Sequence, residues 1–211
     1  VVFPVMSVAF GIGIGTSVVV SRAIGKGDRA QVRRLTTDSL YLTVIAMVLV
    51  SALGLATIEP IFTAMGATKD LLPIIRDYMV LWYFGVGLVA IPIVGNNAIR
   101  ATGDSRTPSV VMMVVAIVNA ILDPFLIFGI GPFPKMGVQG AALATVIAYL
   151  CALLAGLWVL GKREQMLEGG FPIPQTAWVS WKLVLYIGAP AAMANMLAPI
   201  SSAALTRMVA R

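Results

Sequence analysis

The feature that most constrains this chain is the spacing of its charged residues, which gather in short groups separated by long uncharged stretches. A helix needs about 20 mainly apolar residues to cross about 30 Å of hydrocarbon. Uncharged stretches of suitable length lie at residues 1–21, 39–58, 78–99, 107–122, 136–161 and 183–206. The fourth is interrupted by Asp123 and then resumes, so its full extent is 107–129. The sequence therefore predicts an all-α membrane protein with six transmembrane helices.

The composition excludes several functional classes. Of the 211 residues, 59% are hydrophobic and 11% are charged, whereas soluble domains are about 45–50% apolar and about 25% charged. A soluble enzyme is thereby excluded. Cys151 is the only cysteine and histidine is absent, which argues against an internal disulfide, a zinc site, haem or an iron–sulfur cluster. The net charge of +6 comes from cations near helix ends, so the expected partners are anionic lipid headgroups and not nucleic acid.

The cations are distributed unevenly between the two predicted sides of the membrane. If loops alternate sides, residues 22–38, 100–106 and 162–182 share one side and hold ten Lys and Arg residues, against three in the loops of the other side. The positive-inside rule places the first set in the cytoplasm. The stretch 162–181 combines charges, Gly, Pro and two tryptophans, which predicts a cytoplasmic linker on the membrane surface. It separates five helices in residues 1–161 from a sixth in residues 182–211.

Two of these cytoplasmic turns resemble each other, namely SRAIGKGDR from Ser21 and IRATGDSRTP from Ile99. Each has an Arg in the last helical turn, a Gly suited to a left-handed cap and an Asp suited to the following turn. The pattern favours a helix stop, with a gating contact between lobes as the alternative. In the first span, Gly11 and Gly15 form a stripe of small residues that allows another helix to approach closely.

Asp123 is the costliest residue in the sequence, because it is the one acid placed well inside a predicted span. A carboxylate at the bilayer centre costs about 2.5–3.5 kcal/mol on insertion scales, and such residues usually face the bundle interior. Asn119 precedes it by four residues and so lies on the same helix face. Pro124 leaves the carbonyl of Ala120 without its helical donor. We interpret this face as a functional polar site. The alternative is that Asn119 and Asp123 only hold neighbouring helices together through polar contacts.

The segment NAILDPFLIFGIGPFPKMGVQGAALATVIAYL, from Asn119 to Leu150, together with the two turn motifs, resembles the multidrug and toxic compound extrusion (MATE) antiporters. In that family twelve helices form two six-helix lobes, and efflux of drugs is exchanged for inward Na⁺ or H⁺. The resemblance implies that this chain corresponds to helices two to seven. It is then a partial bundle: the first lobe without its first helix, plus the first helix of the second lobe. Because the sequence opens inside a span, we expect it to be an excerpt of a longer protein.

The resemblance also implies which residues act. The Asn and Asp of the family's fifth helix fall on Asn119 and Asp123, and a Thr of its sixth helix falls on Thr145. These three residues would bind the coupling Na⁺ or H⁺. Apart from the resemblance, we expect Tyr149 and Asn195 to line the cavity. We expect no catalytic residue, no cofactor and no metal other than Na⁺ at Asp123. The expected partners are a small organic substrate, lipids and the rest of the same transporter, in a bacterial or archaeal plasma membrane.

Helix geometry, together with this resemblance, predicts that these polar groups meet in the outer half of the membrane. With a rise of 1.5 Å per residue, Asp123 lies roughly 9 Å and Thr145 roughly 10 Å below the outer surface. Asn119 and Tyr149 each lie one turn deeper on the same faces. We therefore expect Asp123, Asn119 and Thr145 to share one polar pocket. The alternative is that Thr145 bonds its own helix backbone.

Other functions fit the sequence less well. A lipid-linked precursor flippase of the same wider superfamily would be expected to carry cations inside its cavity, and no predicted span has one at mid-depth. A membrane-embedded enzyme would normally use His, paired acids or a metal set. A scaffold protein would leave Asp123 without a role.

Overall fold

The computed structural model describes residues 2–64, 71–130, 134–170 and 174–209. Within these ranges, six helices are long and apolar enough to cross a membrane, which confirms the predicted fold class. They are α1 (Val2–Gly25), α2 (Arg29–Ala64), α3 (Leu72–Ala101), α4 (Arg106–Phe128), α5 (Val138–Trp158) and α6 (Pro174–Val209). A short π-helical turn, η1 (Val159–Arg163), extends α5.

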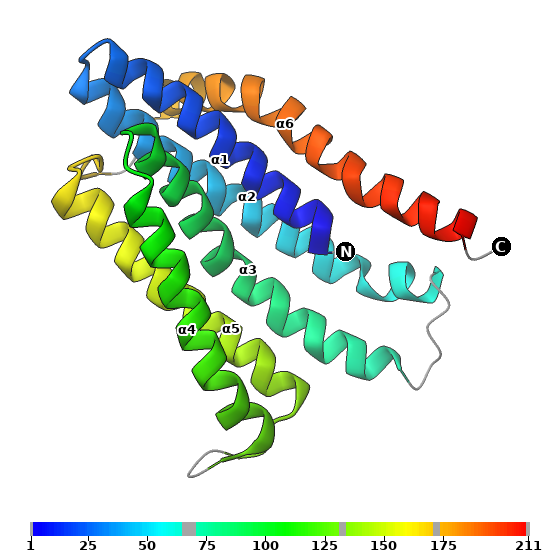
Figure 1. Cartoon of the computed structure of the whole chain (residues 1–211). Coiled ribbons are helices and arrows are strands. Elements are labelled where there is room, and N and C mark those ends of the chain that lie inside the picture. Colours follow the sequence, from blue (N-terminus) through cyan, green and yellow to red (C-terminus); the bar gives the residue numbers. More distant parts are fainter. Residues whose placement is uncertain (1, 65–70, 131–133, 171–173, 210–211) are drawn as a thin grey trace.

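Helix α3 lies at the centre of the bundle. It packs against α1 and α2 on one side and against α5 on the other, and α6 covers α1. Figure 1 shows α4 and α5 as a pair that diverges from α6 toward the α4–α5 connection. The largest cluster of buried side chains joins α1, α2, α3, η1 and α6, and includes Val20, Leu35, Ile99, Leu160 and Val184.

The α1–α6 contact depends on glycine. A Cβ atom added to Gly11 would lie 2.5 Å from the carbonyl oxygen of Gly188, and one added to Gly188 would lie 2.6 Å from the carbonyl oxygen of Gly11. A Cβ on Gly15 would overlap the carbonyl oxygen of Val184. The predicted stripe therefore does admit another helix, and that helix is α6.

Several helices begin earlier than the uncharged stretches predicted. Helix α2 starts at Arg29 instead of residue 39, because Asp28 Oδ1 accepts the backbone N–H of Gln31 at 2.9 Å and caps its first turn. Helix α3 starts at Leu72 instead of residue 78, with a proline in its first turn. Helix α6 starts at Pro174, so the second part of the stretch expected to be linker is helical. An uncharged stretch indicates the part of a helix that contacts hydrocarbon, and the helix itself continues beyond that part.

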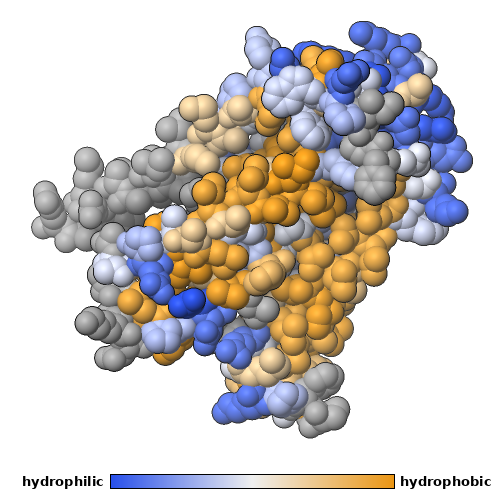
Figure 2. All heavy atoms as spheres, turned by 180° about the vertical axis from the view of Figure 1, so that it is seen from behind, coloured by the Kyte–Doolittle hydropathy of each residue, from blue (hydrophilic) through white to orange (hydrophobic). Residues whose placement is uncertain are grey.

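Hydrophobic and polar residues are distributed over the surface as expected for a membrane protein. Figure 2 shows a broad hydrophobic belt between two hydrophilic ends. At the more polar end, which we call the charged end, the α1–α2 turn, the α3–α4 turn and the segment after η1 meet. Arg33 Nε donates to the carbonyl of Gln165 at 2.9 Å, and the backbone N–H of Glu168 donates to Thr37 Oγ1 at 2.9 Å. The three segments predicted to be cytoplasmic thus lie together at one end.

Candidate functional site

Asn119 and Thr145 meet across the α4–α5 pair. The side-chain amide of Asn119 donates to Thr145 Oγ1 at 3.3 Å. The Thr145 hydroxyl in turn donates to the carbonyl of Ala141, one turn earlier in α5, at 2.9 Å. The Thr145 hydroxyl therefore bonds the backbone of its own helix and also accepts a hydrogen bond from α4.

Asp123 lies one turn from Asn119 on α4 and is partly buried. Its Oδ1 atom is buried, and among the described residues it has no hydrogen-bond partner. Pro124 lies inside α4, so the Ala120 carbonyl lacks its helical donor. A buried carboxylate oxygen without a partner, inside an apolar helix pair, is suited to a hard cation or to a proton.

The helices approach closely at the same level. A Cβ added to Gly140 would overlap the carbonyl oxygen of Leu126, so the start of α5 lies directly against the backbone of α4. Closer to the charged end than this contact, Val111 and Val115 of α4 pack against Ala148 and Ala152 of α5. The polar residues therefore lie between a backbone contact and an apolar cluster of the α4–α5 pair.

A cavity of about 100 Å³ adjoins Thr145 between α3 and α5, and Tyr78, Trp82 and Gly85 also line it. Asp123 and Asn119 are not among its lining residues. Thr145 thus faces both Asn119 and this cavity, and a single pocket shared by all three side chains stays a prediction. The sequence did not predict Tyr78 and Trp82 as neighbours of the site, because it does not show that α3 packs beside α5.

The two residues expected to line a wider cavity differ in position. Tyr149 is partly buried and packs beside the Val111–Ala148 cluster, one turn from Thr145. Asn195 is exposed on α6, a helix that packs on α1 and, less extensively, on α2. The structure therefore places Tyr149 near the α4–α5 site and Asn195 on a different part of the bundle.

Asp123 is not the only acid with a buried carboxylate oxygen inside a helix, although the sequence places no other acid well inside a span. Asp38 in α2 is 2% exposed, and its Oδ2 atom is buried without a hydrogen-bond partner among the described residues. Its backbone carbonyl accepts the indole N–H of Trp181 from α6 at 2.9 Å. Asp38 was missed because α2 begins ten residues before the uncharged stretch, which makes a residue expected at a span boundary part of the helix body.

The two similar turns at the charged end act as helix stops and caps. Asp104 Oδ1 accepts the backbone N–H groups of Arg106 at 2.9 Å and Thr107 at 3.0 Å, and Arg163 Nη2 lies 3.2 Å from Asp104 Oδ2. The hydrogen bond from the Thr107 hydroxyl is the largest cause that lowers the pKa of Asp104, followed by the backbone bond from the same residue. This ion pair joins η1 to the start of α4.

Comparison with protein-family models finds MatE over residues 1–125, more than half of the chain. A relative from Shewanella oneidensis, "FAD transporter", is 42% identical over 98% of this chain and 46% of its own length. "Probable multidrug resistance protein NorM" of Thermotoga maritima is 32% identical over 86% of this chain and 39% of its own length. The chain spans about half the length of the curated relatives it matches.

Solved structures agree with this fold. The Vibrio cholerae MATE transporter VcmN in its bent form matches with a TM-score of 0.85 at 28% identity, over 98% of this chain and 46% of that one. An inward-facing multidrug resistance MATE family transporter matches with a TM-score of 0.77 at 25% identity, over 92% of this chain and 43% of that one. The six helices thus correspond to about half of such a transporter.

Proposed function

The chain belongs to the MatE family and is part of a multi-pass membrane protein, and from this premise we propose that the whole protein exports small organic compounds in exchange for inward Na⁺ or H⁺. Asp123 binds the coupling cation, and Asn119 and Thr145 hold the surrounding polar groups of the site in place. The cation is itself transported and is not a resident cofactor. The observation that carries the proposal is the Oδ1 atom of Asp123 in the α4–α5 pair, which is buried and has no hydrogen-bond partner in the part of the chain that the structure describes.

The physical support is the cost of that arrangement. A buried carboxylate oxygen without a hydrogen-bond partner is destabilising, and the remainder of α4 is strongly apolar. Intramembrane acids of this kind commonly serve ion pathways or proton relays. Because a proton or Na⁺ would neutralise the carboxylate, occupancy relieves the cost of burial, and release restores it. An acid in such a position can therefore make the stability of one conformation depend on the bound cation.

The experiment is transport by the full-length protein in inverted membrane vesicles, with Na⁺ and pH gradients imposed separately. We expect Asp123→Asn to insert normally and to lose gradient-driven transport, because the amide cannot carry the compensating negative charge. The matched control is Asp28→Asn, which removes one acid at the charged end while Asn still caps α2. Undiminished transport by a well-expressed Asp123→Asn variant would reduce Asp123 to a structural role.

A second candidate concerns the exported compound. The Shewanella relative named as an FAD transporter is 42% identical over 98% of this chain, whereas the Bacillus subtilis relative named as a probable multidrug resistance protein is 26% identical over 98%. The higher identity favours FAD as a substrate to test beside cationic drugs. In the same vesicles, uptake of FAD but not of ethidium would identify an FAD exporter, and the reverse would identify a drug exporter.

A further inference from the structure

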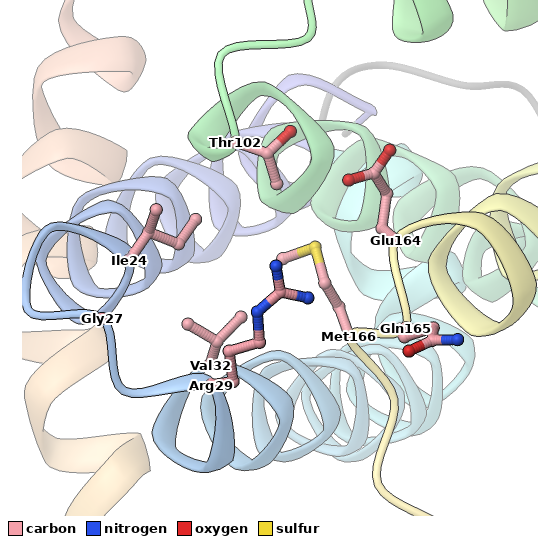
Figure 3. A pocket seen from close by; sticks show the side chains of 8 residues that line it. All are labelled: Ile24, Gly27, Arg29, Val32, Thr102, Glu164, Gln165 and Met166. Carbon is pink, nitrogen blue, oxygen red and sulfur yellow. The ribbon is translucent and has the colours of Figure 1, made fainter.

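A second cavity lies at the charged end, at the opposite end of α4 from Asp123. Its volume is about 310 Å³, at the lower limit of the roughly 300–1,000 Å³ typical of small-molecule sites. Figure 3 shows that its walls come from the α1–α2 turn, the α3–α4 turn and the residues that follow η1. Seventeen residues of helical rise, roughly 25 Å, separate the start of α4 from Asp123, so this cavity is distinct from the proposed cation site.

Part of the cavity wall is apolar. Val32 of α2 and Met166 after η1 are 7% and 2% exposed, and both line the cavity. Ile24, in the last turn of α1, is 37% exposed and lines it as well. An apolar wall among charged turns would favour a ligand with an apolar body, because binding would remove this surface from water.

The polar groups of the cavity have an unbalanced charge. Figure 3 shows the Arg29 side chain reaching from the first turn of α2 into the space between Val32 and Thr102. Among the described residues, no ion pair or hydrogen bond holds its guanidinium group. Glu164, on the opposite wall, is already paired with Arg163, whose Nε lies 3.6 Å away. Within the described part of the chain, the cavity therefore offers one cation without an ion-pair partner, and Glu164 can accept a hydrogen bond.

The backbone of the residues after η1, which form one wall of the cavity, is fixed by hydrogen bonds. The backbone N–H groups of Glu164 and Met166 donate to the carbonyls of Val159 at 2.9 Å and Leu160 at 2.8 Å. Between them, Gln165 has φ of 51°, which a residue with a side chain rarely adopts. Its carbonyl accepts the 2.9 Å bond from Arg33. Such backbone conformations persist where the surroundings fix them, and they occur often at ligand sites.

We propose that this cavity is a binding site for a small organic anion that has an apolar ring and a hydrogen-bond donor on the opposite side of that ring. Arg29 binds the anionic group, Ile24, Val32 and Met166 contact the ring, and Glu164 accepts from the donor. A bound ligand bridges the two helix turns and the segment that follows η1. The site is separate from Asp123 and does not depend on the proposed transport cycle.

A suitable probe is 4-aminobenzoate, which carries a carboxylate at one end of a flat ring and an amine at the other. Two analogues test its parts, since 4-aminobenzamide lacks the charge and benzoate lacks the donor. Binding to the purified full-length protein is measured by calorimetry at constant ionic strength. We expect 4-aminobenzoate to bind about tenfold more tightly than 4-aminobenzamide, because the charge-assisted hydrogen bonds to Arg29 are lost, and benzoate to bind with intermediate affinity.

Variants locate the binding. Arg29→Gln should weaken 4-aminobenzoate binding about tenfold or more, whereas Lys26→Gln, which removes the same charge from a residue outside the cavity lining, should leave it unchanged. Asp123→Asn should also leave it unchanged, because Asp123 is not part of this cavity. Equal loss in the Arg29 and Lys26 variants would overturn the proposal by reducing the effect to net charge. Loss in Asp123→Asn, or no binding by the native protein, would overturn it as well.

Discussion

Two antiparallel helix pairs extend from the charged end, α1–α6 and α4–α5, and they are held together differently. In α1–α6, three glycines bring the two backbones into direct contact over two turns. In α4–α5, one glycine makes such a contact, and the next turns carry Asp123, Asn119 and Thr145. Backbone contact between α1 and α6 leaves no room for a solute. The α4–α5 pair instead contains the Asp123 carboxylate, a polar group that stability alone does not require. The comparison separates a packing surface from the proposed cation site.

The largest expected effect comes from filling the α1–α6 contact. Gly188→Leu places a side chain where even a Cβ would lie 2.6 Å from a backbone carbonyl oxygen of α1. Overpacking a core costs about 1–3 kcal/mol when neighbours can move, and a backbone carbonyl moves little. We expect the full-length variant to lose more than about 3 kcal/mol of stability, measured by thermal unfolding in detergent. Gly156→Leu is the control, since nothing lies within 4 Å of a Cβ there, and equal losses would contradict the packing account.

The sequence anticipated these two pairs to different extents. It predicted that α4 and α5 bring Asn119 and Thr145 together, because consecutive helices joined by a short connection must be neighbours and helical rise gives their depth. It predicted that Gly11 and Gly15 admit a helix, yet it could not identify α6, because that contact joins residues far apart in the chain. Helix ends at Arg29, Leu72 and Pro174 were missed, since caps and prolines set them, not hydropathy.

A smaller effect is expected from Gly140→Ala, which tests the single backbone contact of α4–α5. The added methyl group meets the Leu126 carbonyl, so the pair must separate slightly, at a cost of about 1–3 kcal/mol. We expect the transport rate to fall by a larger fraction than the loss of stability alone would cause, because the separation shifts Thr145 relative to Asn119. The measurement is the initial rate of vesicle transport beside the unfolding temperature. A fall in stability with normal transport would show that the spacing of α4 and α5 is unimportant for function.

The charged end, from which both pairs extend, provides a pH-dependent prediction. Because the pKa of Asp104 is lowered in the folded protein, its carboxylate stabilises the fold above the ordinary Asp pKa of about 4. This contribution is lost as the pH falls through the lowered value. We expect the native protein to be more stable than Asp104→Asn at pH 7, and the difference to shrink by pH 3. A difference that is the same at both pH values would contradict the assigned role.

The smallest effect on stability is expected from Thr145→Val, which removes the bond from Asn119. A single neutral hydrogen bond contributes about 0.5–1.5 kcal/mol, and unfolding should change by no more than that. Thr57→Val is the matched control, because the Thr57 hydroxyl bonds only within α2, to Leu53 at 2.8 Å and to Gly54 at 3.3 Å. We expect transport to weaken in Thr145→Val alone. Equal transport by the two variants would remove Thr145 from the site.

The central claim, that Asp123 in the α4–α5 pair binds the coupling cation, is tested most directly by measuring substrate binding against Na⁺ concentration and pH. The full-length protein is purified, and the affinity for the compound it exports is titrated in the native form and in Asp123→Asn. Coupled sites change each other's affinity about 5–150-fold. The account predicts that raising Na⁺ or lowering pH weakens substrate binding by about tenfold in the native protein and has no effect in Asp123→Asn. The same dependence in both proteins would contradict it.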